Sequence, residues 1–251
     1  MCSSDLEPEL VDMLRGHLAD EGIEIITGVT IEEVRPGPEL VVTVDGATRT
    51  LQGDVLLVAT GRTAEVEGLG LEHTAVQADR RGVSIDPYLA TGEPGVYAAG
   101  DVVGLPYGAF THVARRMGIS VAENALALSP HPADQDVGPT AIFTDPELAA
   151  IGLTETAARD AGYDIGVASS GFSGGKARAW GEERGMVKVI VDRPTRRILG
   201  AHVLAYHGAD LIHPVAVAMK APGGIVDPIL EAFHIHPTLG EVVQTVAKAA
   251  V

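Results

Sequence analysis

The sequence predicts an α/β segment followed by an α+β module. Three observations support this fold class. A helical pattern and a hairpin pattern open the chain, apolar strand-like runs that stop at glycine occupy its middle, and strands followed by helices fill its second half. A chain of 251 residues usually holds one or two domains, and these signals divide this one into three pieces.

The first piece opens with a predicted helix over residues 8–21. Pro8 suits the first turn of a helix, and Gly22 suits the position just after its end. The apolar residues that recur there at helical spacing are Leu10, Val11, Leu14 and Leu18. The helix is therefore expected to bury one face and to stop at the glycine.

A strand-rich stretch is predicted to follow this helix. Apolar runs at residues 23–26 and 40–44 favour strands, and an Asp45–Gly46 turn leads into residues 48–51. An Asp-Gly pair between two apolar runs is typical of a β-hairpin. We therefore expect the last two runs to pair with each other.

The middle piece holds two apolar runs that end in glycine. Residues 54–61 read as a strand that stops at Thr-Gly, and residues 95–100 read as a short buried strand that leads into Asp101. Glycine lets the backbone approach a ligand closely, and an aspartate at the carboxyl end of a strand can bind a sugar hydroxyl. Each match is weak when taken alone.

The third piece follows a linker at residues 128–138, where proline and acidic residues interrupt the periodicity. Its predicted elements are strands at residues 185–192 and 197–204, and helices at residues 208–220 and from Thr238 to the end. Pro214 is expected to start or kink the first of these helices. Strands that precede helices in this way indicate an α+β module.

Composition and charge exclude several function classes. The formal net charge is −16, with 34 acidic against 18 basic residues, which opposes binding to nucleic acid or to an anionic membrane. The sequence contains no run of 18 or more uncharged apolar residues, the length needed to span a bilayer, and the N-terminus has no signal-peptide layout. A single cysteine argues against a secreted disulfide scaffold. We therefore expect a cytoplasmic protein with neither a membrane nor a nucleic-acid partner.

The most informative short segment is His236-Pro-Thr238-Leu-Gly-Glu241. A histidine is the side chain best suited to moving protons near neutral pH, and a carboxylate beside it can set its tautomer and stabilise its charged form. The alternative is structural, because Thr238 and Glu241 also have the spacing of a helix capping box. Both interpretations remain open on these residues alone.

In this order, the motifs resemble those of the pyridine nucleotide-disulfide oxidoreductases, the flavoprotein family of dihydrolipoyl dehydrogenase, glutathione reductase and mercuric reductase. The resemblance runs from about residue 7 to the C-terminus. The matching segments are residues 54–62, 69–72, 79–86, 95–102, 141–147, 151–155, 198–202 and 236–238.

The resemblance assigns the fold class more closely: an α/β remnant of nucleotide-binding domains plus an α+β dimerisation domain. It implies the C-terminal part of an NAD(P)-binding domain at residues 1–53, the returning segment of an FAD-binding domain at 54–128 and the dimerisation domain at 139–251. The family's glycine-rich fingerprints and its Cys-x4-Cys pair are absent, and the only cysteine is Cys2, to which we assign no role. We therefore expect the C-terminal half of a longer enzyme, inactive by itself.

The activity that the resemblance implies is that of an FAD-dependent NAD(P)-disulfide oxidoreductase, most like dihydrolipoyl dehydrogenase. A thiolate is the reactive form of sulfur, so a base must remove a proton and return it. The resemblance makes His236 that base and Glu241 its partner, reaching the flavin and disulfide of the opposite subunit of a homodimer. The expected substrate is a small-molecule thiol or disulfide, or a lipoyl domain.

The resemblance also nominates contacts to FAD. Gly100 and Asp101 match the segment in which the aspartate accepts a hydrogen bond from a ribityl hydroxyl, although an Asx turn would explain Asp101 as well. Thr111 matches the start of a helix that faces the pyrimidine edge of the flavin, where exposed amides stabilise negative charge. Gly61 matches a glycine near the cofactor. His234 is expected to be structural.

Two other classes of function remain open. The chain could be a non-catalytic dimerisation or interaction module, or a member of the family that resembles mercuric reductase or quinone reductase. The C-terminal sequence Ala-Lys-Ala-Ala-Val251 lacks the vicinal cysteines of strict mercuric reductases. A metal site is not expected, because the remaining histidines lack paired spacing with cysteine or carboxylate residues.

Overall fold

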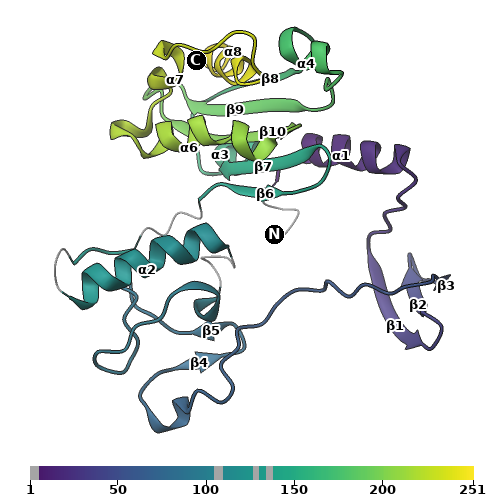
Figure 1. Ribbon diagram of the computed structural model, residues 1–251, viewed down its shortest axis with the longest axis vertical. Coiled ribbons are helices and arrows are strands. Elements are labelled where there is room, and N and C mark those ends of the chain that lie inside the picture. The colour runs from purple at the N-terminus through teal and green to yellow at the C-terminus, as the bar shows by residue number, and fades with distance from the viewer. Residues whose placement is uncertain (1–5, 105–109, 127–129, 134–137) are drawn as a thin grey trace. The chain divides into compact units, whose positions relative to one another are not determined.

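The computed structural model describes residues 6–104, 110–126, 130–133 and 138–251. It divides into two compact units (Figure 1): a smaller one, Arg15–Arg62, and a larger one made of Met1–Leu14 and Thr63–Val251.

Helix α1 (Pro8–Asp20) begins in the larger unit and ends in the smaller one. Leu10 and Leu14 are buried on one face, as the apolar spacing predicted. At its C-terminus Gly22 has φ 86° and donates its N–H to the Ala19 carbonyl, while Ile23 donates to Leu18. This is a Schellman motif, and the predicted helix is confirmed.

The smaller unit holds a three-stranded antiparallel sheet of β1 (Val29–Arg35), β2 (Glu39–Val44) and β3 (Ala47–Gln52). Asp45 and Gly46 have φ of 51° and 77°, which allows the tight turn that pairs Val44 with Ala47. The predicted hairpin is therefore confirmed. Strand β1 was not predicted, because its Glu32-Glu33 pair interrupts the apolar pattern.

Two predicted strands of this unit are wrong. Residues 23–26 and 54–61 form no strand, and Val55 and Leu57 are 84% and 86% exposed. An apolar run becomes a strand only when a neighbouring strand pairs with its backbone, and no described residue does so here. Sequence pattern alone cannot supply that partner.

In the larger unit, residues 63–133 form a small cluster of short elements. These are η2 (Leu71–His73), β4 (Ala78–Asp79), β5 (Gly82–Val83), η3 (Gly100–Val103) and α2 (Thr111–Ala125). Their buried core is Leu89, Val103, Met117 and Ala133. The predicted strand at residues 95–100 is wrong, because only Tyr97 forms an isolated bridge, to Ala90. The predicted linker at 128–138 lies largely outside the described residues.

Residues 138–251 form a five-stranded antiparallel sheet with the order β6-β7-β10-β9-β8. The strands are β6 (Thr140–Ile142), β7 (Glu147–Gly152), β8 (Ile165–Gly171), β9 (Met186–Asp192) and β10 (Ile198–Ala205). All of β10 is buried because it lies at the centre of the sheet. The two predicted strands correspond to β9 and β10 and are confirmed.

Helices accompany this sheet (Figure 1). They are α3 (Glu155–Asp160), α4 (Gly175–Trp180), α5 (Gly208–Leu211), α6 (His213–Lys220), η4 (Pro222–Gly224), α7 (Asp227–Glu231) and α8 (Glu241–Ala249). Pro214 stands in the first turn of α6, as predicted, and α8 begins three residues later than expected. The main core joins the sheet to α6, α7 and α8.

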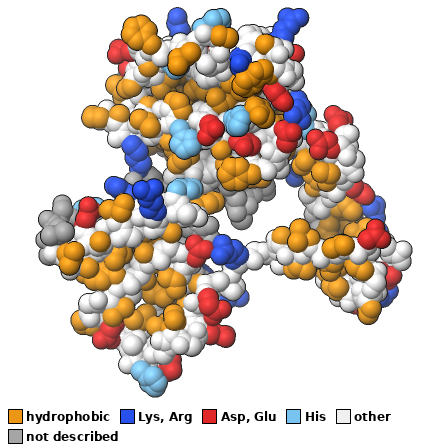
Figure 2. Space-filling model, viewed as in Figure 1, with side chains coloured by type: hydrophobic (Ala, Val, Ile, Leu, Met, Phe, Trp, Pro, Cys, Tyr) orange, Lys and Arg blue, Asp and Glu red, His pale blue; other side chains and the backbone are white. Residues whose placement is uncertain are grey.

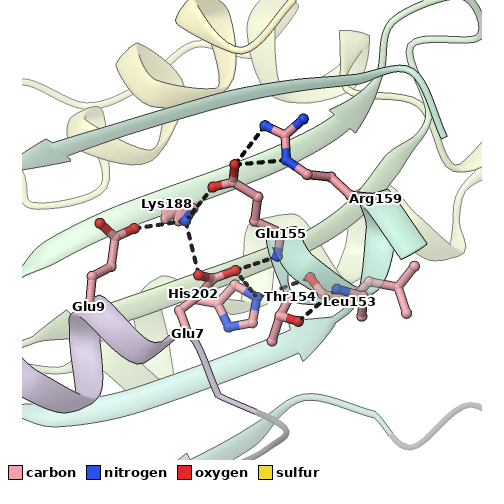
Figure 3. A network of polar contacts seen from close by, with 9 residues as sticks. Glu7, Glu9, Leu153, Thr154, Glu155, Arg159, Lys188 and His202 are labelled. Carbon is pink, nitrogen blue, oxygen red and sulfur yellow. Dashed lines mark hydrogen bonds and ion pairs between the residues drawn. The ribbon is translucent and has the colours of Figure 1, made fainter. Parts of the chain in front are cut away.

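A buried polar network ties the start of the chain to this sheet (Figure 3). The Lys188 ammonium on β9 contacts Glu7 at 2.9 Å, and Glu9 and Glu155 at 2.8 Å. Burial by itself lowers the pKa of Lys188, but hydrogen bonds to the three carboxylates outweigh it and raise that pKa above its ordinary value. The Glu7 carboxylate also accepts the N–H of Glu155, at the start of α3. Lys188 therefore stays charged inside the protein.

Candidate functional site

The His236 and Glu241 side chains are in direct contact. The Nδ1 atom of His236 lies 2.9 Å from Oε1 of Glu241, and the backbone N–H of Thr238 donates to Oε2 of Glu241 at 2.8 Å. The Thr238 bond and then the His236 bond lower the pKa of the Glu241 carboxyl below its ordinary value. The carboxylate is therefore ionised and only accepts, which places the imidazole proton on Nδ1 and leaves the Nε2 lone pair available in the neutral ring.

The local sequence explains how the short loop holds this geometry. The Thr238 hydroxyl donates to the Ile235 carbonyl at 2.7 Å, and Leu239 is buried just before α8 begins. Glu241 accepts from the Thr238 amide, which is one half of a capping box. The capping and dyad interpretations of Glu241 thus hold together, because its two oxygens accept from different groups.

The dyad lies at the protein surface. The His236 side chain is 76% exposed and that of Glu241 is 33% exposed. Two neighbours in the loop, Phe233 and Ile235, are also exposed. Apolar side chains are visible at several places on the surface (Figure 2). A proton carrier in this position has access to groups outside the chain.

Gly100 and Asp101 begin η3, which packs directly on the first turn of α2. Gly100 has φ 77°, and a Cβ there would lie 3.2 Å from the Cβ of Ala114. Both the backbone conformation and the close approach therefore favour glycine. Asp101 is exposed in the first turn of η3, where its carboxylate can reach a ligand.

Thr111 is the first residue of the 15-residue helix α2. Phe110 occupies the N-cap position with φ −118° and provides no side-chain cap. Amides at such a helix start present partial positive charge. The structure thus brings Gly100 beside the first turn of the helix that Thr111 opens. A glycine that lets η3 pack closely on α2, an exposed aspartate and an N-cap residue, Phe110, without a capping side chain are compatible with a nucleotide such as FAD.

Gly61 belongs to the smaller unit, in the segment that forms no strand. Its φ is 117°, and a Cβ at this position would meet no atom within 4 Å. Backbone conformation, rather than a close neighbour, is what favours glycine here.

No group of three or more His, Cys, Asp or Glu side chains in the described ranges could hold a metal ion. In the same ranges, no helix is both long and apolar enough to cross a membrane.

The structure thus combines a sheet module that carries the His236–Glu241 contact with a preceding cluster in which Gly100 packs on the helix that Thr111 opens. Two family models match the chain: pyridine nucleotide-disulphide oxidoreductase over residues 1–126, and the dimerisation domain of the same family over residues 138–247. The chain belongs to the pyridine nucleotide-disulphide oxidoreductase family, whose members use FAD and NAD(P).

Individual relatives agree with this family. The dihydrolipoyl dehydrogenase of Bacillus subtilis is 34% identical over 248 residues, which are 96% of this chain and 52% of that protein. The mercuric reductase of Staphylococcus aureus is 32% identical over 94% of this chain and 43% of its own length. This chain spans about half the length of the curated relatives it matches.

A solved structure of a related protein has the same fold. The HOCl-induced flavoprotein disulfide reductase RclA from Escherichia coli superposes with a TM-score of 0.86 at 26% identity, covering 99% of this chain and 57% of its own. The mixed α/β fold is therefore that of part of a flavoprotein disulfide reductase.

Proposed function

We propose that this chain is the C-terminal portion of an FAD-dependent NAD(P)-disulfide oxidoreductase, most like dihydrolipoyl dehydrogenase. The observation that carries the proposal is the 2.9 Å contact between Nδ1 of His236 and Glu241, which leaves Nε2 as a free base. The substrate would be a small-molecule thiol or disulfide, or a lipoyl domain.

His236 would move the proton that thiol-disulfide exchange requires. Its Nε2 takes the proton of a thiol, the resulting thiolate attacks a disulfide sulfur, and the imidazolium returns the proton to the thiolate that leaves. Glu241 stabilises the imidazolium and keeps the ring oriented. The cysteine pair of this chemistry is not supplied by this chain, whose only cysteine is Cys2.

Gly100, Asp101 and Thr111 would hold FAD, with Gly61 as a further contact. When bound, FAD supplies two-electron redox chemistry between the thiols and NAD(P). The Asp101 carboxylate would accept a hydrogen bond from a ribityl hydroxyl, and the amides at the start of α2 would stabilise negative charge near the pyrimidine edge. The close packing of Gly100 on α2 and the lack of a capping side chain at Phe110 support this assignment.

We assign residues 1–53 to the NAD(P)-binding domain, 54–128 to the FAD-binding domain and 139–251 to the dimerisation domain. A homodimer through the last of these would place the dyad against the flavin and disulfide of a second subunit. Phe233 and Ile235, 105% and 78% exposed beside the dyad, are suited to burial in such an interface. Sedimentation at micromolar concentration should give a dimer, and a monomer would contradict this arrangement.

The decisive experiment restores the N-terminal half from a close relative and compares His236→Gln with the parent. Turnover should fall by roughly 10²–10⁴-fold, the usual contribution of a positioned acid-base group. Flavin content and dimerisation should not change. Stopped-flow traces should locate the loss in the thiol-disulfide half-reaction, and unchanged kinetics would rule out His236 as the base.

A second candidate function is a non-catalytic dimerisation module. The single cysteine and the unpaired apolar segment at residues 54–61 favour it. Flavin absorbance of the purified 251-residue chain separates the two. A stoichiometric yellow protein supports cofactor binding by these residues, whereas a colourless dimer supports the module. In both cases this chain alone should not reduce lipoamide with NAD(P)H.

A further inference from the structure

The loop that carries His236 and the helix that carries Glu241 are attached to α7 by two side chains to which the sequence assigned no part in the reaction. The Nε2–H of His234 donates to the Ile229 carbonyl at 2.9 Å. The Gln244 amide on α8 donates to the Leu230 carbonyl at 3.1 Å, and Ala232 lies within 3.5 Å of the same amide. These carbonyls lie toward the C-terminal end of α7, and the backbone becomes extended at Ala232. The last carbonyls of a helix have no N–H donor within the helix, so side chains can donate to them.

Helix α7 is a fixed support for these contacts. Val226 and Ile229 are buried in the main core. The Arg196 guanidinium binds the Asp227 carboxylate through two bonds of 2.9 Å, and the Val226 N–H donates to the Arg196 carbonyl at 3.0 Å. Two-pronged bonds of this kind restrict orientation as well as distance. The start of α7 is thereby joined to the turn between β9 and β10.

The two contacts secure both members of the dyad to one helix. His234 precedes His236 by two residues, so it holds the loop, while Gln244 lies one turn after Glu241 on α8 and holds the carboxylate side. Further side-chain hydrogen bonds here are short-range: the Thr238 hydroxyl donates to the Ile235 carbonyl, and the Thr245 hydroxyl donates to the Glu241 carbonyl within α8. Among the described residues, the side-chain hydrogen bonds that join the loop and α8 to α7 are those of His234 and Gln244, and apolar packing in the main core accompanies them.

We propose that His234 and Gln244 are positioning residues that keep His236 in line with Glu241. Neither touches the reacting atoms; each acts through the loop or helix that carries the dyad. The proposal deepens the proposed function, on which it rests, by naming the residues that preserve the proton on Nδ1 and the lone pair on Nε2. A misplacement of even 1 Å at such a site can be costly for the reaction.

The ring-nitrogen NMR spectrum of this chain tests the proposal without turnover. The parent should show His236 with its proton on Nδ1. His234→Phe and Gln244→Leu each remove a donor and keep side-chain bulk, so both should shift the ring toward the mixed tautomers of imidazole in water. The pKa of the Glu241 carboxyl should also rise part of the way to its ordinary value, because the Thr238 bond remains while the His236 bond weakens.

Four further variants complete the test. His234→Gln can still donate from a similar position and should restore the parent tautomer. Lys248→Gln changes an exposed residue on α8 and should have no effect. Amide NMR spectra establish whether each variant folds. If His234→Phe does not fold, His234→Ala replaces it, and if Gln244→Leu does not fold, Gln244→Met replaces it. A parent-like tautomer in a folded variant of each position overturns the proposal.

The restored full-length enzyme separates this proposal from the proposed function. Gln244→Leu should lower kcat by roughly 10-fold to 100-fold with little change in KM. If His236→Gln abolishes turnover but substitutions at His234 and Gln244 leave the tautomer of His236 unchanged, only the positioning role is wrong. If the tautomer responds but His236→Gln leaves turnover unchanged, the catalytic role is wrong and the structural coupling stands.

Discussion

Two polar sites in this protein use the same kind of bond in opposite surroundings. In the buried network, the Lys188 side chain is 7% exposed and the Glu7 side chain is 4% exposed. In the dyad, the His236 side chain is 76% exposed. The buried cation has three carboxylate neighbours, whereas the exposed imidazole uses one nitrogen and leaves the other available. A buried charge requires oppositely charged partners, and exposure permits a free lone pair.

Two histidines also differ in burial, with a different consequence for proton transfer. His202 is fully buried on β10, and its Nε2–H donates to the Leu153 carbonyl at 3.1 Å. Its Nδ1 has no hydrogen-bond partner among the described residues, and burial lowers the pKa of the ring, which stays neutral. Such a ring packs but cannot exchange protons readily with a substrate. His236 differs because water and a partner can reach it.

The largest expected effect comes from removing the buried cation. Lys188→Met leaves the Glu7 carboxylate inside the protein without its ammonium, so the free energy of unfolding should fall by about 3 kcal/mol. This is the lower end for a broken buried pair, because Glu9 reaches water. Urea denaturation measures the loss. The matched control, Lys248→Met on the surface of α8, should stay within about 0.5 kcal/mol. Equal stabilities of the two variants would show that the network is not structural.

The pH dependence of stability should follow the same network. Lys188 and then Arg159 lower the pKa of Glu155, so its contribution is present above the ordinary pKa of 4.5 and is lost as pH falls through the folded value. The raised pKa of Lys188 acts at the other end: its contribution is complete below 10.5 and is lost as pH rises through the folded value. The stability difference between the parent and Lys188→Met should therefore be widest between these limits. A difference that is flat from acid to alkaline pH would contradict the assignment.

The smallest expected effect on stability comes from Glu241→Gln. Gln also accepts the Thr238 N–H, so the melting temperature should stay close to that of the parent. Turnover of the restored enzyme should still fall, though less than in His236→Gln, because the imidazole loses charge stabilisation but remains present. Thermal melts and steady-state kinetics of the same preparations check both statements. Parent-like turnover would leave Glu241 as a helix cap only.

The sequence predicts local structure correctly where residues close together in the chain determine the backbone conformation. The end of α1 at Gly22, the Asp45–Gly46 hairpin and the break before Pro214 all follow from backbone conformations of one or two residues. The contact between His236 and Glu241 has the same origin, since both groups lie within one short loop and the first turn of α8.

By itself, then, the amino-acid sequence determined the family, the local turns and the pairing of His236 with Glu241, because those depend on residue types at short spacing. Only the tertiary structure decided which apolar runs became strands, since pairing needs a remote partner that residues 54–61 do not find. It also decided that Lys188, a lone charge in the apolar run of β9, binds Glu7 across 181 residues of sequence. Finally, it decided that His234 and Gln244 contact α7. Burial and long-range contacts are properties of the folded chain, and no local pattern specifies them.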